Sequence, residues 1–384
     1  MAHHSTVFAQ LLKIFPRHEF RAAAQRHHRG RRLRAISRWD QFLALVMAQL
    51  TGRVSLRDLV ANFNAQSHKL YHLGARPIAR SSLARLNQHQ PAQLFEEIFR
   101  RLLARTQAKA PGHRFRFKGK LISLDASMVE LTASLFPWAR YQATKGAIKL
   151  HIGLDHDGHL PVFVRITEGR EHELHWAKSL QLPAGSVVVF DRGFFDFDFF
   201  NQLSQKDIRF VTRLKRDIAY TVVERRPVVA GTGVTSDQIL RFKGRKAQRL
   251  GLQLRRVGYR DPETGRHYYF LTNAMDLAAS TVAQVYKDRW QIELFFKWIK
   301  QNLKIKSFLG TSRNAVLSQI WVALSVYLLM AYLKFLGRAG WSLSQLLRLL
   351  QLNLFERRSL AGLLKPPDRP PDLRSAQLAL EIGA

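Results

Sequence analysis

The residues best suited to chemistry lie between positions 286 and 300, where one carboxylate stands among cations and a phenol. At about 3.6 residues per turn, a helix over this stretch places five side chains on one face, within an arc of about 80°. These are Tyr286, Arg289, Glu293, Lys297 and Lys300. A surface helix with i,i+4 ion pairs, such as Glu293 to Lys297, has the same pattern. The stretch therefore indicates either a solvated helix or a site where a carboxylate works beside cations.

Two aspartates upstream favour the second interpretation. Asp125 follows the apolar run at 120–124, and Asp191 follows the apolar run at 186–190. Sites of open α/β sheets lie at the C-terminal ends of strands, so neighbouring strands would bring these carboxylates close together. Two buried like charges are unfavourable unless a divalent cation lies between them, and Glu293 would be a third ligand. Taken singly, each aspartate has a simpler explanation as a turn or helix cap.

An all-oxygen ligand set predicts a site for Mg²⁺ or Mn²⁺. The chain has no cysteine, which excludes disulfides and thiolate zinc sites. Two such ions would activate an attacking hydroxyl and stabilise the leaving oxygen of a phosphodiester. The three acidic residues therefore predict phosphoryl transfer on nucleic acid.

The charge of the chain points to the same partner. Its 384 residues include 61 Lys and Arg against 28 Asp and Glu, a formal net charge of +33. The basic residues are spread along the whole chain, as a protein lying along a duplex requires. A hydrophobic content of 46% excludes disorder of the whole chain, and the length suggests two or three domains.

The elements that would position these residues change in kind along the chain. In the first 110 or so residues the pattern predicts three helices. One spans 39–50, the second starts at the capping pair Ser55 and Asp58, and the third begins at Ser81. They are compatible with a DNA-reading module or with a plain helical domain. Further on, strands are predicted at 120–124, 149–154, 160–166, 186–190 and 208–214, with a helix at 172–180 and a polar connection at 201–207. This order predicts a mixed sheet covered by helices.

The residues of the predicted site resemble a known family. The spacing Tyr286-x2-Arg289-x3-Glu293-x6-Lys300 is similar to the Y-R-E-K signature of DDE transposases of the insertion sequence 4 family. The surrounding words agree, with SLDAS and FDRGF around the two aspartates, TN at 272–273 and GTS at 310–312. The similarity runs from about residue 15 to 335. The segment with WDQF and SLRDL resembles the helical domain that precedes the catalytic domain in one branch of that family.

The resemblance implies an α/β, ribonuclease H-like fold in which Asp125, Asp191 and Glu293 bind two catalytic divalent ions. It implies a DNA transposase that acts as a homodimer on terminal inverted repeats and target DNA. Water would nick the element's end, the freed 3′-hydroxyl would form a hairpin on the opposite strand, and after hairpin opening it would join the target.

The same correspondence assigns DNA contacts on the helix at 286–300. Tyr286, Arg289 and Lys300 would hold phosphates near the cut, a role that suits a phenol and two cations. Trp290 and Lys297 would make further DNA contacts, although Trp290 fits core packing equally well.

The implied organisation has four parts. A helical, DNA-binding domain spans 1–115, and a catalytic domain spans 116–216 and 268–335. A β-rich insertion occupies 217–267, and a C-terminal helix with a Pro-rich tail follows at 336–384. In some members of the family the insertion supplies a tryptophan that stacks on a flipped base. This insertion has no tryptophan, which leaves Tyr220, Phe242, Tyr259 or another aromatic for that role.

Other features predict structural roles. His172, Glu173 and His175 predict the opening of a helix instead of a metal site. The apolar run at 316–333 predicts a buried helix instead of a membrane span, and 341–352 predicts an amphipathic helix that packs on the core or on a second subunit. No signal peptide is recognisable, so we expect a bacterial cytoplasmic protein associated with the nucleoid and not with a membrane.

Two other functions remain open from the sequence. One is a ribonuclease H-like nuclease that cuts DNA without joining strands. The other is a non-catalytic basic DNA-binding protein in which the acidic residues are structural.

Overall fold

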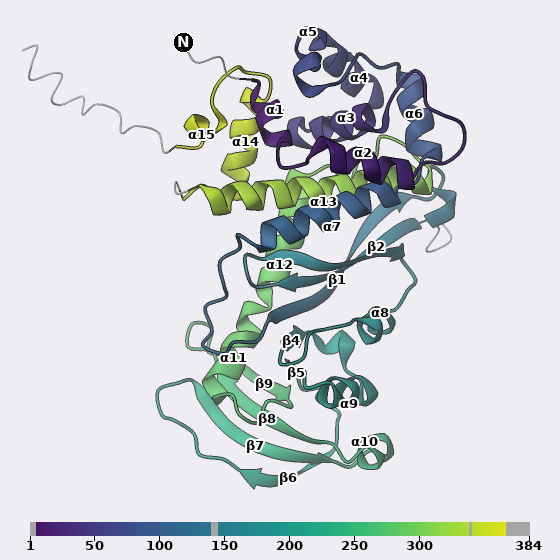
Figure 1. Cartoon of the computed structure of the whole chain (residues 1–384). Helices are drawn as coiled ribbons and strands as arrows, with labels where there is room; N and C mark the ends of the chain where they lie inside the picture. Colours follow the sequence, from purple (N-terminus) through teal and green to yellow (C-terminus); the bar gives the residue numbers. More distant parts are fainter. Residues whose placement is uncertain (1–4, 140–144, 338–339, 366–384) are drawn as a thin grey trace, which may run out of the picture.

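A mixed sheet of nine strands organises the chain from residue 121 to 272. The computed structural model describes residues 5–139, 145–337 and 340–365 (Figure 1). The spatial order of the strands is β3-β2-β1-β4-β5-β9-β8-β7-β6. Their bounds are β1 Leu121–Thr132, β2 Lys145–Asp155, β3 Leu160–Glu168, β4 Val187–Phe190, β5 Arg209–Arg213, β6 Tyr220–Arg225, β7 Val234–Phe242, β8 Gln253–Arg260 and β9 His267–Thr272.

The strand directions follow from the connections. β1, β2 and β3 form antiparallel hairpins, whereas β4 and β5 return parallel to β1 through crossover helices. This half has the arrangement expected of a ribonuclease H-like sheet, so the predicted mixed sheet flanked by helices is confirmed. The strands β6 to β8, which lie in the predicted insertion, pair antiparallel and reach β5 through β9, so they extend the same sheet.

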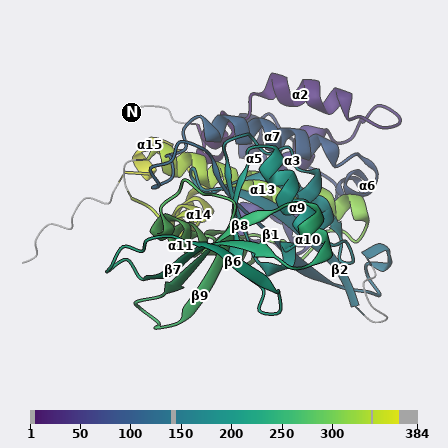
Figure 2. The same cartoon turned by 90° about the horizontal axis from the view of Figure 1, so that it is seen from below.

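Helices cover both faces of the sheet because its central strands are apolar on both sides. The side chains of β4 alternate between two clusters: Val188 and Phe190 pack under α8 and α9, and Val187 and Val189 pack under α11. Figure 2 shows α9 and α10 on one side of the strands and α11 on the other. The covering helices are α8 Glu173–Ser179, α9 Phe197–Gln205, α10 Arg245–Arg249, α11 Ala279–Asp288 and α12 Trp290–Asn302.

Helix α9 corrects the polar connection predicted at 201–207. Asp196 caps the helix by accepting a hydrogen bond from the Phe199 amide. Phe199, Phe200 and Leu203 are spaced to bury one helical face on the sheet. The polar residues that suggested a connection lie on the opposite, solvated face.

A helical layer packs beside the hairpin strands. Its members include α1 Val7–Leu12, α2 Arg17–Arg26, α3 Arg38–Thr51, α4 Leu56–Ala65, α5 Ser67–Leu70, α6 Arg80–His89 and α7 Gln93–Gln107. The helices predicted in this region correspond to α3, α4 and α6. Ser55 starts α4 by accepting from the Asp58 amide, and Gly52 ends α3 with a positive φ of 73°.

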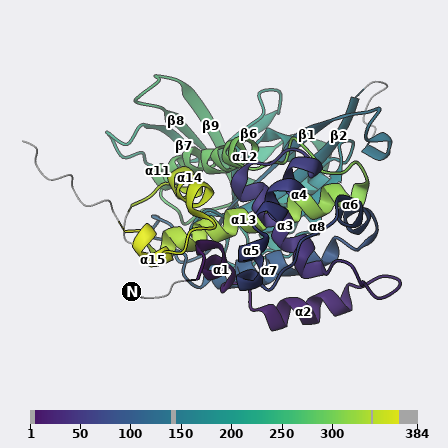
Figure 3. The ribbon, with the colours of Figure 1, turned by 90° about the horizontal axis from the view of Figure 1, so that it is seen from above.

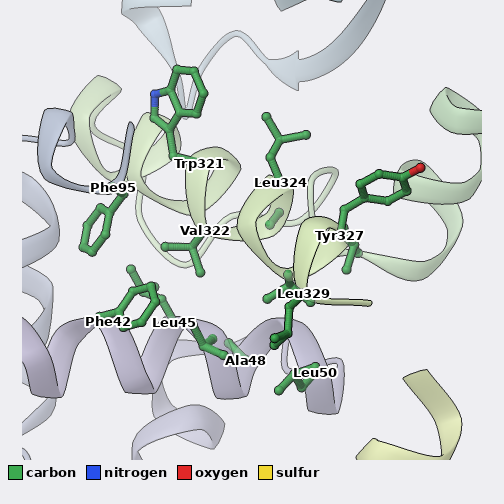
Figure 4. Close-up of a cluster of buried hydrophobic side chains, with 14 of the residues drawn as sticks. Phe42, Leu45, Ala48, Leu50, Phe95, Trp321, Val322, Leu324, Tyr327 and Leu329 are labelled. Carbon is green, nitrogen blue, oxygen red and sulfur yellow. The ribbon is translucent and has the colours of Figure 1, made fainter. Parts of the chain in front are cut away.

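Helix α13 (Arg313–Leu336) is the centre of this layer. It contacts α3, α6, α7 and the C-terminal helix α14, Leu343–Asn353 (Figure 3). In Figure 4 its Val322 and Leu329 point toward Phe42 and its neighbours on α3, and Trp321 projects from the opposite side of α13; all of them belong to one apolar cluster. The helix is long and apolar enough to cross a membrane, but 89% of that apolar window is buried inside the protein. It is therefore a core helix, as the sequence predicted.

The C-terminal helices pack on the same layer. Helix α14 (Leu343–Asn353) contacts α13 and α3, so the amphipathic helix predicted at 341–352 packs on the core of its own chain. The short helix α15 (Leu360–Leu363) follows. The predicted Pro-rich tail beyond Lys365 lies outside the described residues.

Candidate active site

Asp125 and Asp191 occupy equivalent positions on neighbouring parallel strands. The β1–β4 ladder ends at the pair Leu124 and Phe190, and each aspartate comes directly afterwards. Side chains alternate along a strand, so both aspartates fall on the face where Leu121 and the odd-numbered valines of β4 pack under α11. Asp125 is not at the end of its strand, because β1 continues to Thr132 beside β2. It lies where the pairing of β1 with β4 stops, so the two strands separate just beyond Leu124 and Phe190. This place, at the C-terminal end of β4, is called the site edge below.

The groups around Asp125 and Asp191 do not fully compensate the negative charge of the two carboxylates. Burial raises the pKa of the Asp125 carboxyl to about 7; the Ala126 amide and Arg289 oppose this shift, and the nearby Asp191 and Glu173 add to it. Asp125 Oδ1 accepts from the Ala126 amide at 2.8 Å. Asp191 Oδ1 accepts from the Gly193 amide, also at 2.8 Å. Asp125 and Asp191 together therefore favour the binding of a cation between them.

Glu293 reaches this edge through Arg289. Arg289 Nη2 lies 2.5 Å from Glu293 Oε1, and its Nη1 lies 4.0 Å from Asp125 Oδ2. The Arg289 side chain is 15% exposed, and its buried Nε has no hydrogen-bond partner among the residues that the structure describes. Burial lowers the pKa of Arg289. The nearby Tyr286, Glu293 and Asp125 raise this pKa by a larger amount, so the net shift is upward. The positive charge of Arg289 thus holds the Glu293 carboxylate on the same side as the two aspartates.

The helix predicted over 286–300 is divided at this arginine. Helix α11 ends at Asp288 and α12 begins at Trp290, with Arg289 between them. The amide of Arg289 bonds to the Tyr286 carbonyl, and the amide of Ile292 bonds to the Arg289 carbonyl, both across three residues. The tighter turn leaves the direction of the chain nearly unchanged in Figure 1.

Tyr286 and Lys300 flank the acidic group at its two ends. The Arg289 guanidinium lies 5.7 Å from the centroid of the Tyr286 ring, and burial raises the pKa of that phenol above its usual value. Lys300 Nζ donates to Ser127 Oγ of β1 at 2.6 Å. Burial and the nearby Lys306 lower the pKa of Lys300. Both side chains therefore face the site edge from α11 and α12.

The other two residues of the predicted helix face lie further out. Lys297 is exposed on α12, and Trp290 is 55% exposed. Trp290 is therefore not a core residue, which removes one of the two roles that its sequence allowed.

Glu173 is a neighbour that the sequence did not assign to the site. His172 caps α8 and Glu173 opens it, as predicted. A side-chain carbon placed on Gly193 would lie 3.0 Å from Asp191 Oδ1 and 3.6 Å from Glu173 Oε2. The glycine thus leaves a space between these two carboxylates. Lys149 Nζ, 3.4 Å from Glu173 Oε1, balances part of the charge.

The donor chemistry of this edge fits a divalent cation. Oxygen is the ligand that Mg²⁺ and Mn²⁺ prefer, and the space beside Gly193 and the raised pKa of Asp125 both favour a cation there. In the described parts of the chain, no three His, Asp or Glu side chains are close enough together to form a metal site. Arg289 explains this in part, because it occupies the position between Glu293 and Asp125.

The insertion offers aromatic side chains of different accessibility. Phe242 is 2% exposed and packs against Phe197, so it is not free to stack on a base. Tyr220 and Tyr259 are half-buried. Tyr269, on β9 just after the insertion, is 46% exposed, with the Arg256 guanidinium 4.8 Å from its ring centroid.

These features define an α/β protein with an acidic site where the inner strands β1 and β4 stop pairing. Residues 116–329 match the family model described as the transposase DDE domain, and the chain belongs to this family. Residues 3–76 match a domain of unknown function, DUF4372.

Several transposases are similar to the chain. A putative transposase of Sinorhizobium fredii is 30% identical over 305 residues, covering 78% of this chain and 83% of the relative. A probable transposase for an insertion sequence element of Geobacillus stearothermophilus is 30% identical, covering 62% of this chain and 63% of the relative. Among solved structures, a piggyBac transposase synaptic complex with hairpin DNA matches with a TM-score of 0.45 and 12% identity, covering 96% of this chain and 83% of that chain.

Proposed function

We propose that this transposase moves an insertion sequence by cut-and-paste phosphoryl transfer on DNA, and that it belongs to the insertion sequence 4 group with the Y-R-E-K signature. The observation that carries the proposal is the equivalent register of Asp125 and Asp191 on one sheet face, with Glu293 held beside them by Arg289. The excess of 61 basic over 28 acidic residues supports a polyanionic substrate.

The acidic residues are the proposed metal ligands. Asp125, Asp191 and Glu293 would hold Mg²⁺ or Mn²⁺, two ions per site. When bound there, the ions supply activation of the attacking hydroxyl and stabilisation of the leaving oxygen. Glu293 becomes available when the Arg289 guanidinium turns from it to a phosphate, since phosphate and carboxylate offer the same bidentate geometry.

The residues around the ligands bind and orient the DNA. Arg289 and Lys300 hold phosphates on either side of the cut, and the Tyr286 hydroxyl donates to a third phosphate oxygen. The exposed Trp290 and Lys297 extend this contact along α12. Bidentate and point-charge contacts of this kind fix the phosphodiester in line with its attacking group.

The proposed reaction has four steps at phosphorus. Water cuts one strand at the element's end, and the freed 3′-hydroxyl attacks the opposite strand to form a hairpin. A second hydrolysis opens the hairpin, and the 3′-hydroxyl then joins target DNA. Two copies of the chain acting on paired terminal inverted repeats would carry out these steps on the bacterial nucleoid.

The test uses a labelled duplex that carries the element's own end and flank. Purified protein is incubated with this DNA and Mg²⁺, and the products are sized under denaturing conditions. Hairpins and strand-joined products support transposition, whereas nicks alone indicate a nuclease. The Asp125→Asn variant is expected to bind the duplex but cut it at least about 100-fold more slowly, since even residues that only support a metal ligand contribute 10–100-fold. Cutting at the wild-type rate by this variant would contradict the proposal.

A further inference from the structure

The helical layer carries two long segments without acidic residues. One runs between Glu19 and Asp40, and the other between Asp58 and Glu96. They contain the loop after α2 and the helix α6, and the two come together at a groove of about 820 Å³ lined by Arg31, Arg34 and residues of α6. The structure thus gathers cations from separate segments on one side of this layer.

The loop from Arg29 to Arg34, here called the arginine loop, is held in place through its backbone. Gln90, 6% exposed, donates to the Arg29 carbonyl at 2.6 Å and accepts from the Arg29 amide at 3.2 Å. At the other end, Arg76 Nη2 donates to the Arg34 carbonyl at 2.9 Å. Gly30 adopts a positive φ of 79° between these anchors, a conformation that suits glycine. The backbone of the loop is therefore held at both of its ends.

The side chains of the arginine loop are free for a partner. Its four arginines, Arg29, Arg31, Arg32 and Arg34, are exposed, and none has an ion-pair partner within the described ranges. Glu97, an acidic residue of the same helical layer, is already engaged by Arg26, His27 and Arg101. A set of unpaired guanidinium groups fixed by their backbone suits the regular charges of a duplex.

Helix α6 presents an exposed face that is mostly polar, with side chains of the types that can hydrogen-bond to base edges. Its exposed positions are Arg80, Ser81, Ala84, Arg85, Gln88 and His89. Arginine pairs with guanine and glutamine with adenine in the major groove, and serine can bond to either. At 10 residues, α6 is about 15 Å long and narrow enough for that groove.

The position of α6 relative to the catalytic edge is fixed. Asn314 at the start of α13 donates to the carbonyls of Asn87 and Gln90 and accepts from the Ala92 amide. At the other end of α6, the Asn64 side chain bonds to both the amide and the carbonyl of Ile78. Because α13 also packs against the sheet strand β3, α6 and the sheet form one packed unit.

We propose that the exposed face of α6 and the arginine loop form the surface that reads duplex DNA sequence at a fixed offset from the cut. The inference rests on the proposed function, because the offset is defined by the catalytic edge. It assigns DNA recognition to a surface of the helical layer, with α6 in the major groove and the arginine loop on the adjoining phosphates.

The offset follows from the strand that connects the two places. From Asp125 to Thr132, β1 advances about 23 Å at 3.3 Å per residue. Beyond it, Pro137 and Trp138 line one pocket together with Ala84 and Gln88 of α6. Figure 1 shows α6 above this end of β1 and β2. For a duplex that runs along β1, the base pairs read by α6 therefore lie about seven or more from the cut phosphate, at about 3.4 Å per pair.

The test selects DNA from a duplex library with a random core of about 20 base pairs, two helical turns. The full-length chain is expected to enrich a motif. The Arg85→Ala variant should bind that motif about 5- to 150-fold more weakly and lose one base preference. The Arg31→Ala/Arg32→Ala variant should weaken binding to motif and scrambled duplexes alike, and reduce the log-log salt slope by about 1.8.

Two further variants keep the test decisive. Arg85→Lys retains the charge but not the bidentate fork, so it should lose specificity with the salt slope unchanged even if the alanine variant folds poorly. Arg100→Ala, on α7 with its side chain 71% exposed, is the matched control and should select the wild-type motif. The inference is overturned if no motif is enriched, if single-stranded RNA competes better than the selected duplex, or if the Arg85 variants bind it unchanged.

The outcome separates this inference from the proposed function. If Asp125→Asn selects the same motif while wild-type protein never cuts DNA, recognition stands and the catalytic proposal fails. If wild-type protein cuts and joins DNA but the Arg85 variants keep the wild-type motif, catalysis stands and this surface is wrong.

Discussion

The ion pair between Arg255 and Asp237 offers the sharpest test of how the insertion supports the site. Both side chains are almost fully buried, 3% and 4% exposed. Arg255 Nε and Nη2 donate to the two oxygens of Asp237 at 2.8 and 2.7 Å. Its Nη1 donates to the carbonyls of Ala274 and Leu277, in the segment that leads into α11. The pair thus fixes the start of α11, which carries Tyr286 and leads to Arg289.

Removing one partner should be far more costly than removing both. The Asp237→Ala variant leaves a buried guanidinium with two of its bonds lost, which we expect to lower the free energy of unfolding by about 3–5 kcal/mol. The double variant Asp237→Leu/Arg255→Met has no buried charge and should be at least about 2 kcal/mol more stable than Asp237→Ala.

Urea unfolding of the wild type and the variants, followed by circular dichroism, measures these differences. The single variant Arg255→Met completes the set. A loss below about 1 kcal/mol for Asp237→Ala, or a double variant as unstable as the sum of two single losses, would refute the reasoning that the charges depend on each other.

Three other outcomes can be checked with single substitutions. Gly193→Ala should slow DNA cutting and weaken its Mg²⁺ dependence, measured by Mg²⁺ titration of the cutting rate, because the new carbon would lie 3.0 Å from Asp191 Oδ1; an unchanged titration would contradict this. Burial raises the pKa of Glu97, but hydrogen bonds from Arg101, Arg26 and His27 outweigh burial and bring this pKa down to about 2. The stabilisation that ionised Glu97 contributes is therefore present above about pH 4.5 and is lost as the pH falls toward 2. Glu97→Gln should cost about 1 kcal/mol at pH 7 in thermal unfolding and remove that part of the acid sensitivity, and equal acid sensitivity would count against it. Lys300→Met should weaken DNA binding and lower the salt slope by about 0.9, whereas Ser127→Ala keeps the cation and should keep the slope.

Much of the fold could be predicted from local patterns. The apolar run of β4 predicts a strand buried on both faces, and the structure shows both faces covered. The apolar residues of α13 mark a buried helix because they continue around its whole circumference. Helix α9 was missed because its polar residues, at the end of the segment, are ordinary for a solvated helix face. The continuous nine-stranded sheet could not be predicted, since the pairing of β5 with β9 joins residues about 60 positions apart.

The candidate site divides in the same way. The sequence by itself determined which side chains could do the chemistry: Asp125 and Asp191 after apolar runs, and Glu293 on a helix face with Arg289, because strand and helix periodicity are local. Only the tertiary structure decided that Arg289 lies between Glu293 and Asp125, and that Glu173 joins the acidic group from α8. The physical reason is that charge balance depends on distances between elements, and packing sets those distances. One sequence position carries no record of which unlike charge will lie beside it.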